Sequence, residues 1–140
     1  MNRYLPLVVA MLLGSGSVTA QNFENLFNGQ RALYGAGHSF IFEGKEYTTD
    51  HPEELEAAAT ATADNARVLL ASAKSKQAEV KAIGFDWTLT KGILKSAEKA
   101  LKKGDFHKAM QLAAQAKYHA RMGLAQYHRA GQDWINAVPQ

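Results

Sequence analysis

The spacing of apolar and polar positions predicts a long helix that begins close to Pro52. From Leu55 to Ile83, apolar or small residues recur at alternating steps of three and four, which is typical of a helix face that packs against another helix. A proline near the first helical position, followed by acidic residues in the first turn, is typical of a helix start. Gly84 ends the pattern, so we predict one continuous helix over 52–83.

A second and shorter helix is predicted near Leu89 to Lys103. Asp86 can serve as its N-cap, because a carboxylate can accept a backbone N–H that is left free in the first turn. The residues predicted on its inner face are Leu89, Ile93, Ala97, Ala100 and Leu101. Gly104 can adopt the left-handed conformation that ends a helix, and Asp105 can cap the helix that follows.

The third predicted helix runs from Phe106 to about Ala130 and is built for close packing. Its apolar or small positions again alternate at three and four: Phe106, Ala109, Ala113, Ala116, Ala120, Gly123, Tyr127, Ala130 and Trp134. Most of these residues are alanine or glycine, so a partner helix can approach closely. Short connections make neighbouring helices antiparallel. We therefore predict an all-α fold, an antiparallel three-helix bundle of long-short-long helices over residues 51–140, in which the outer two overhang the middle one.

The first 50 residues divide into two segments. Residues 1–20 have a basic start (Arg3), an apolar centre and small residues ending in Val18-Thr19-Ala20, which predicts a secretory signal peptide cleaved after Ala20. Residues 21–50 form a short aromatic N-terminal arm, with a short helix over 22–34 and a small hairpin of 39–42 with 45–48 as one prediction. A loosely ordered arm is the alternative, since an isolated two-stranded hairpin is marginal in water.

Export and composition restrict the chemistry. The chain has 140 residues, a formal net charge of +3 and no cysteine, which excludes disulfides, thiolate metal sites and haem attached through Cys-x-x-Cys-His. We expect a periplasmic protein with no membrane span after signal cleavage and no nucleic-acid partner. We expect no cofactor either. Self-association through the small-residue face stays open.

Basic side chains gather after Gly84. Lys91, Lys95, Lys99 and Lys102 lie at helical spacing on one face of the second predicted helix. A solvated face is one interpretation. The other is a docking face for an acidic protein surface, where charge would raise the association rate.

The histidines of the third predicted helix do not form a metal site by their spacing. His119 and His128 are nine residues apart, which places them on opposite sides of a helix, and the i, i+4 spacing of a helical metal site is absent. We interpret His107, His119 and His128 as surface or interface residues. No phosphate-binding loop, nucleophile motif or carboxylate pair appears, so we predict a non-enzyme.

A family resemblance covers about Leu55 to Tyr127, and its motifs begin at Gly84. Gly84-Phe85-Asp86-Trp87, the Lys-rich stretch 93–100 and the segment 104–109 together resemble the SoxXA-binding protein family, and Met122-Gly123 with Gln126 is similar to its last helix. Thr88-Leu89 departs from the Arg-Asp pair that members tend to have after the tryptophan. The resemblance implies a small exported helical protein that associates with the c-type cytochrome SoxXA and enhances thiosulfate oxidation, with any haem belonging to the cytochrome.

Three aromatic residues complete the candidate partner-binding set of Trp87, Lys91, Lys95, Lys99, Tyr118 and Tyr127. Trp87 either holds the turn between the first two helices against Ile83 and Leu89, or anchors an interface, as Trp and Tyr often do at binding hot spots. The rival function is a general envelope scaffold or chaperone-like binder of exported proteins. An enzyme or metal carrier that uses the histidines is a weaker third reading.

Overall fold

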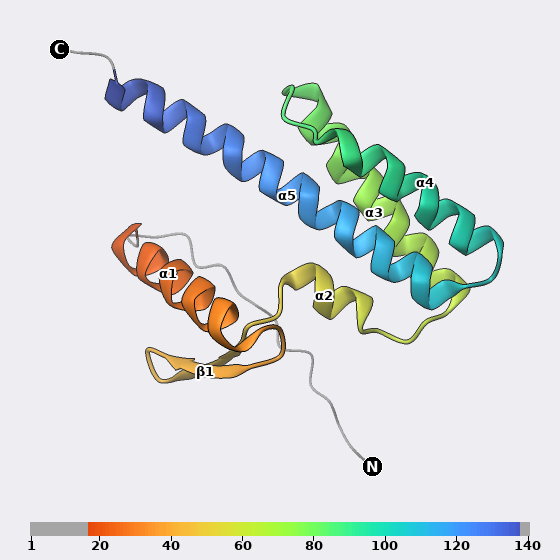
Figure 1. The fold of residues 1–140 in the computed structure, drawn as a ribbon, viewed down its shortest axis with the longest axis horizontal. Helices are drawn as coiled ribbons and strands as arrows, with labels where there is room; N and C mark the ends of the chain where they lie inside the picture. The colour runs from red at the N-terminus through yellow and green to blue at the C-terminus, as the bar shows by residue number, and fades with distance from the viewer. Residues whose placement is uncertain (1–16, 138–140) are drawn as a thin grey trace. The chain divides into compact units, whose positions relative to one another are not determined.

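The computed structural model describes residues 17–137, and their side chains from 19 to 131. This part of the chain is mostly helical, with one small two-stranded sheet (Figure 1). It divides between Thr49 and Asp50 into two compact units, which we call the N-terminal unit and the helical unit. The predicted boundary lies one residue later. The signal segment predicted over 1–20 lies almost wholly outside the described residues.

The N-terminal unit contains the predicted hairpin. Helix α1 (Ser17–Tyr34) precedes strands β1 (Ser39–Phe42) and β2 (Lys45–Thr48), which pair antiparallel. The two turn residues, Glu43 and Gly44, both have positive φ angles, of 49° and 76°. A two-residue turn of this kind matches the twist of its strands. The hairpin prediction is confirmed, whereas the helix begins five residues earlier than predicted and continues across the predicted cleavage point after Ala20.

Aromatic packing explains how such a small hairpin is held. The ring of Phe23 on α1 lies 6.0 Å from that of Phe40, 5.3 Å from that of Phe42 and 4.9 Å from that of Tyr47. Phe27 adds a further contact with Phe40 at 6.3 Å. Because α1 covers one face of the sheet with rings, the hairpin gains the apolar support that it lacks in isolation.

The helical unit has four helices within the described residues, because the first predicted helix is broken. It consists of α2 (Pro52–Ala57), α3 (Ala63–Ala82), α4 (Thr88–Lys102) and α5 (Phe106–Ala137). The prediction of one continuous helix over 52–83 is therefore wrong. The Thr62 hydroxyl accepts the N–H of Asn65 at 3.1 Å, and the Asn65 amide donates to the Thr60 carbonyl at 2.8 Å. Threonine favours such caps over a helix interior, so a new helix begins here.

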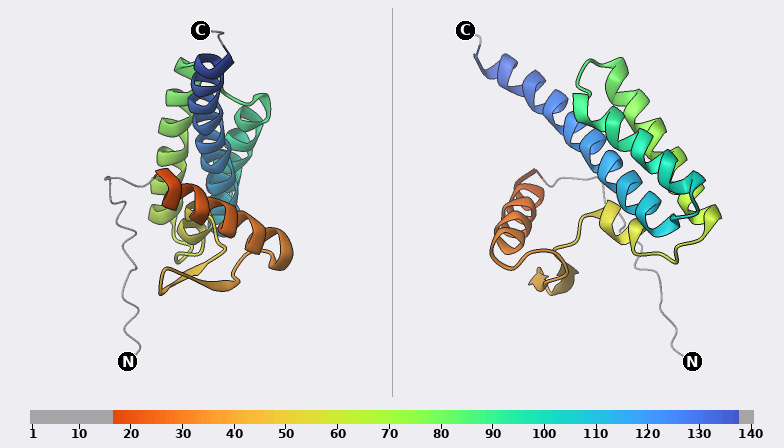
Figure 2. Two further views of the ribbon diagram at one scale, coloured as in Figure 1. Left: turned by 90° about the vertical axis from the view of Figure 1, so that its left-hand side faces the viewer. Right: turned by 45° about the vertical axis from the view of Figure 1, so that its right-hand side comes forward.

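Helices α3, α4 and α5 pack around a shared core of small side chains (Figures 1 and 2). Six alanines distributed over the three helices are fully buried: Ala66, Ala73, Ala97, Ala109, Ala113 and Ala116. Gly123 lies tightly against the α3–α4 turn and α3, since a Cβ atom placed there would lie 2.5 Å from the Phe85 carbonyl oxygen and 2.7 Å from a Val80 methyl carbon. Alanine and glycine thus bring the helix backbones close together, as the pattern predicts.

The helix ends after α3 agree largely with the prediction. Gly84 and Gly104 have φ angles of 74° and 79°, and the Asp105 carboxylate accepts the N–H of Lys108 at 3.1 Å. The N-cap of α4 is Trp87 and not Asp86. Helix α5 continues seven residues beyond the predicted end, and its last part extends past α3 and α4 (Figure 2).

Several residues assigned to inner faces are exposed instead. Leu55 is 54 % exposed, Leu89 is 73 % exposed and Tyr127 is 43 % exposed. Conversely, Thr90 is fully buried. In the first turn of α4 the inner face lies one residue later than predicted. Thr90, and not Leu89, shares a face with the buried Ala97.

Candidate functional site

Trp87 joins the turn between α3 and α4 to the middle of α5. Its indole N–H donates to the Gln126 side-chain oxygen at 3.0 Å, and its ring lies 4.9 Å from the ring of His119. Leu89, its expected neighbour, points into solvent. Trp87 is itself half-buried, so one part of the indole holds the turn while another part reaches the surface.

His119 is an interhelical residue of this turn region. Its Nδ1 atom lies 3.3 Å from the Thr90 hydroxyl, which is buried between α4 and α5. Burial lowers the pKa of His119 below its ordinary value, because the charged imidazolium is less well solvated there. Among the described residues, no group of three or more His, Asp or Glu side chains is placed to hold a metal ion.

The two candidate tyrosines lie on different sides of α5. The Tyr127 ring meets the ring of Phe85 edge-on at 5.4 Å, close to the turn that carries Trp87. The Tyr118 ring instead lies 4.7 Å from the ring of His51, beside α2. The tyrosines are nine positions apart, which leaves them about half a rotation from each other around the helix, so they form no common patch.

The lysine face of α4 is fully solvated. Lys91, Lys95 and Lys99 are all exposed, and none of them forms an ion pair within the part of the chain that the structure describes. The nearby Glu98 pairs with Lys74 of α3. The hydrogen bond and charge of Lys74 lower the pKa of Glu98, which favours its ionised form. Glu98 pairs with Lys74 and is also attracted by Lys95 and Lys102, so a single carboxylate balances only part of the positive charge of this face.

The structure therefore divides the six candidate residues into two groups. Trp87 and Tyr127 lie together at the α3–α4 turn, and α4 begins directly after Trp87, so the lysine face starts beside this pair. We call Trp87, Tyr127 and the three lysines the turn surface. Tyr118 belongs to a second cluster.

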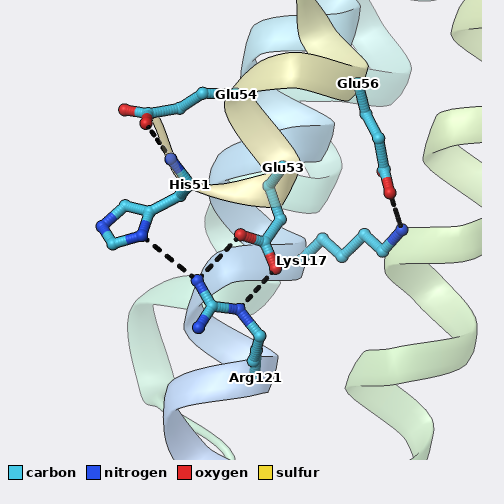
Figure 3. Close-up of polar contacts among 6 residues, drawn as sticks. All are labelled: His51, Glu53, Glu54, Glu56, Lys117 and Arg121. Atoms are coloured by element: carbon cyan, nitrogen blue, oxygen red, sulfur yellow. Dashed lines mark hydrogen bonds and ion pairs between the residues drawn. The ribbon is translucent and has the colours of Figure 1, made fainter. Parts of the chain in front are cut away.

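The second cluster consists of ion pairs between α2 and α5, which the sequence analysis missed (Figure 3). Arg121 binds both carboxylate oxygens of Glu53, and Lys117 binds those of Glu56. The acidic pair has a spacing of three and the basic pair a spacing of four, which is the only signal in the sequence. This spacing could not show which glutamate pairs with which cation, since Glu53 and Arg121 are 68 residues apart in the sequence.

Comparison with protein-family models, curated proteins and solved structures finds no match to this chain. Within residues 17–137, no helix combines the length and the apolar character needed to cross a membrane. The turn surface is thus characterised by its own geometry: a half-buried tryptophan, an exposed tyrosine and three exposed lysines that form no ion pair among the described residues.

Proposed function

We propose that this chain is an exported, non-catalytic accessory protein that binds a SoxXA-type c-type cytochrome and enhances thiosulfate oxidation. The observation that carries the proposal is the exposed lysine face of α4, which follows directly after Trp87 in the chain. Three exposed lysines that form no ion pair among the described residues favour an acidic protein surface as the ligand. The choice of cytochrome rests on the resemblance carried by residues 84–116 and by Gln126.

The two parts of the turn surface would contribute differently to binding. In this proposal α3, α4 and α5 form a rigid antiparallel three-helix bundle that presents both parts. The lysines attract an acidic partner at long range, which raises the association rate more than the final affinity. Trp87 and Tyr127 supply desolvated aromatic contact, which slows dissociation. Any haem belongs to the partner.

Surface-plasmon measurements against the cytochrome of the same organism test the lysine contribution. We expect the triple variant Lys91→Gln, Lys95→Gln and Lys99→Gln to associate about tenfold more slowly at low salt, with little change in dissociation. The difference should shrink as salt shortens the screening length, which is about 8 Å at physiological ionic strength. The matched control neutralises Lys45, Lys81 and Lys108, which are exposed elsewhere and should affect association less.

The aromatic contribution is tested by Tyr127→Ala and Trp87→Ala. Each should speed dissociation at both salt concentrations, because buried apolar contact is largely insensitive to screening. The dissociation rate of Trp87→Ala is informative about binding only if the circular dichroism of this variant matches that of wild type, since Trp87 also holds the α3–α4 turn. If the wild-type protein does not bind the cytochrome at micromolar concentration, the general envelope scaffold becomes the better account.

A further inference from the structure

Helix α2 is attached to α5 mainly by charge. The Nε and Nη2 atoms of Arg121 lie 2.7 and 3.0 Å from the two carboxylate oxygens of Glu53, whose side chain is only 4 % exposed. This two-point geometry is the strong and directional form of a carboxylate–guanidinium contact. It fixes both the position and the rotation of α2 on α5.

A second pair repeats the pattern one turn away (Figure 3). The ammonium group of Lys117 lies 2.7 Å from both carboxylate oxygens of Glu56. Tyr118 stands between the two cations in sequence, and its ring contacts His51. The buried Ala114 lies one turn before Tyr118 on the same side of α5. We call Ala114, Lys117, Tyr118 and Arg121 the α2-facing patch.

Helix α2 itself has few features that hold it in place permanently. It has six residues, and isolated helices of this length are unstable in water. Its one large apolar side chain, Leu55, is 54 % exposed. The buried core is supplied by α3, α4 and α5, to which α2 adds only the partly buried Ala57. The non-helical segment 58–62 separates α2 from α3, so release of α2 from its ion pairs would not require α3 to unwind.

We propose that the α2-facing patch is a binding site for a short acidic helix of a partner protein, with two glutamates three residues apart. Helix α2 occupies the site within the same chain and so limits access to it. The internal occupant defines the ligand chemistry: a bidentate carboxylate for Arg121 and a second carboxylate for Lys117. This site is separate from the turn surface and does not depend on the cytochrome.

A labelled peptide that copies residues 50–58, acetylated and amidated, is the probe. It is titrated into the purified full-length protein and into the double variant Glu53→Gln and Glu56→Gln, which weakens α2 but leaves the α2-facing patch intact. Because apparent affinity rises with the fraction of open sites, the double variant should bind the peptide at least about tenfold more tightly than wild type. A peptide with glutamine in place of Glu53 and Glu56 should lose this gain.

Adding Arg121→Gln to the double variant should abolish peptide binding, whereas adding Lys108→Gln, an exposed lysine of the same helix, should not. Circular dichroism confirms that each variant is folded, and the single variant Glu56→Gln, with an intermediate gain, replaces the double variant if that one unfolds. Equal binding of the peptide to wild type and to the folded glutamate variant would overturn the proposal. So would binding that survives the loss of Arg121.

Discussion

The interiors of the two compact units are filled by side chains of different sizes. The N-terminal unit places large rings between a helix and a hairpin, with Phe23 touching four other aromatic rings. The helical unit fills its centre mainly with buried alanines of α3, α4 and α5, together with a few larger aliphatic side chains such as Leu69, Leu70 and Met110. The first unit depends on a few residues of large area, and the second on close approach of backbones.

This difference indicates which kind of substitution should destabilise each unit most. Removing one ring from the N-terminal unit takes away a large share of its buried apolar area. Adding a single carbon to the tightest part of the helical unit creates a steric conflict that the backbone must absorb. The polar contacts on α5 form a third class, which depends on charge and not on volume.

The largest effect is expected from Phe23→Ala. The change removes the ring at the centre of the aromatic cluster, and truncation of such a residue costs about 3 kcal/mol or more. We expect the near-ultraviolet circular dichroism of the N-terminal unit to be lost while the helical unit keeps its melting temperature. Leu33→Ala is the control, since Leu33 is 75 % exposed. Simultaneous melting of both units in Phe23→Ala would show that they are one cooperative structure.

A paired glycine experiment tests the close packing of the helical unit. A Cβ atom at Gly123 would lie 2.5 Å from the Phe85 carbonyl oxygen and 2.7 Å from a methyl group of Val80, so Gly123→Ala should destabilise by about 1–3 kcal/mol. Gly92→Ala, on the exposed side of α4 with no atom within 4 Å, should instead stabilise by about 0.5–1 kcal/mol. Urea titration measures both, and shifts of the same sign would refute the close approach at Gly123.

The α2–α5 pairs should cost less than the packing changes. Arg121→Gln leaves the buried Glu53 without its cation, which we expect to cost about 1–2 kcal/mol, because the Arg121 side chain is itself 39 % exposed. Lys76→Gln breaks the exposed Lys76–Glu79 pair and should cost less than about 0.5 kcal/mol. Thermal melting at two salt concentrations distinguishes them. Equal losses of stability in the two variants would mean that the burial of Glu53 does not increase the cost of breaking its ion pair.

The smallest effect concerns His119, a polar residue within the alanine-lined interface. The pKa of His119 is lowered in the folded protein, so the unfolded chain takes up this proton first as the pH falls. Its contribution to stability is fully present above the ordinary pKa of 6.5 and decreases from there down to the folded pKa. In this pH window we expect the free energy of unfolding of His119→Gln to vary less with pH than that of wild type or of the control variant His107→Gln. An unchanged slope in His119→Gln would contradict this.

Local sequence alone was sufficient where a feature depends on neighbouring residues. The hairpin over 39–48 needed only alternating residues around Glu43-Gly44, because glycine readily adopts the positive φ angle of the turn. Gly84 and the Gly104-Asp105 turn ended and restarted helices for similar local reasons. The alanine face of α5 also predicted close packing, since side-chain size is a property of the residue itself.

The remaining features needed the tertiary structure, because they depend on contacts between distant residues. The three-four spacing runs unbroken through 58–62, yet the chain leaves the helix there, and α2 is held by charges 61 and 68 residues away. The burial of Thr90 depends on His119 across the helix interface, which no local pattern contains. Residue type placed Tyr118 and Tyr127 in one candidate set, as aromatic residues common at interfaces, whereas their neighbours are the His51 ring for Tyr118 and the Phe85 ring for Tyr127. Periodicity restricts which residues share a face, and only the neighbouring elements determine what that face meets.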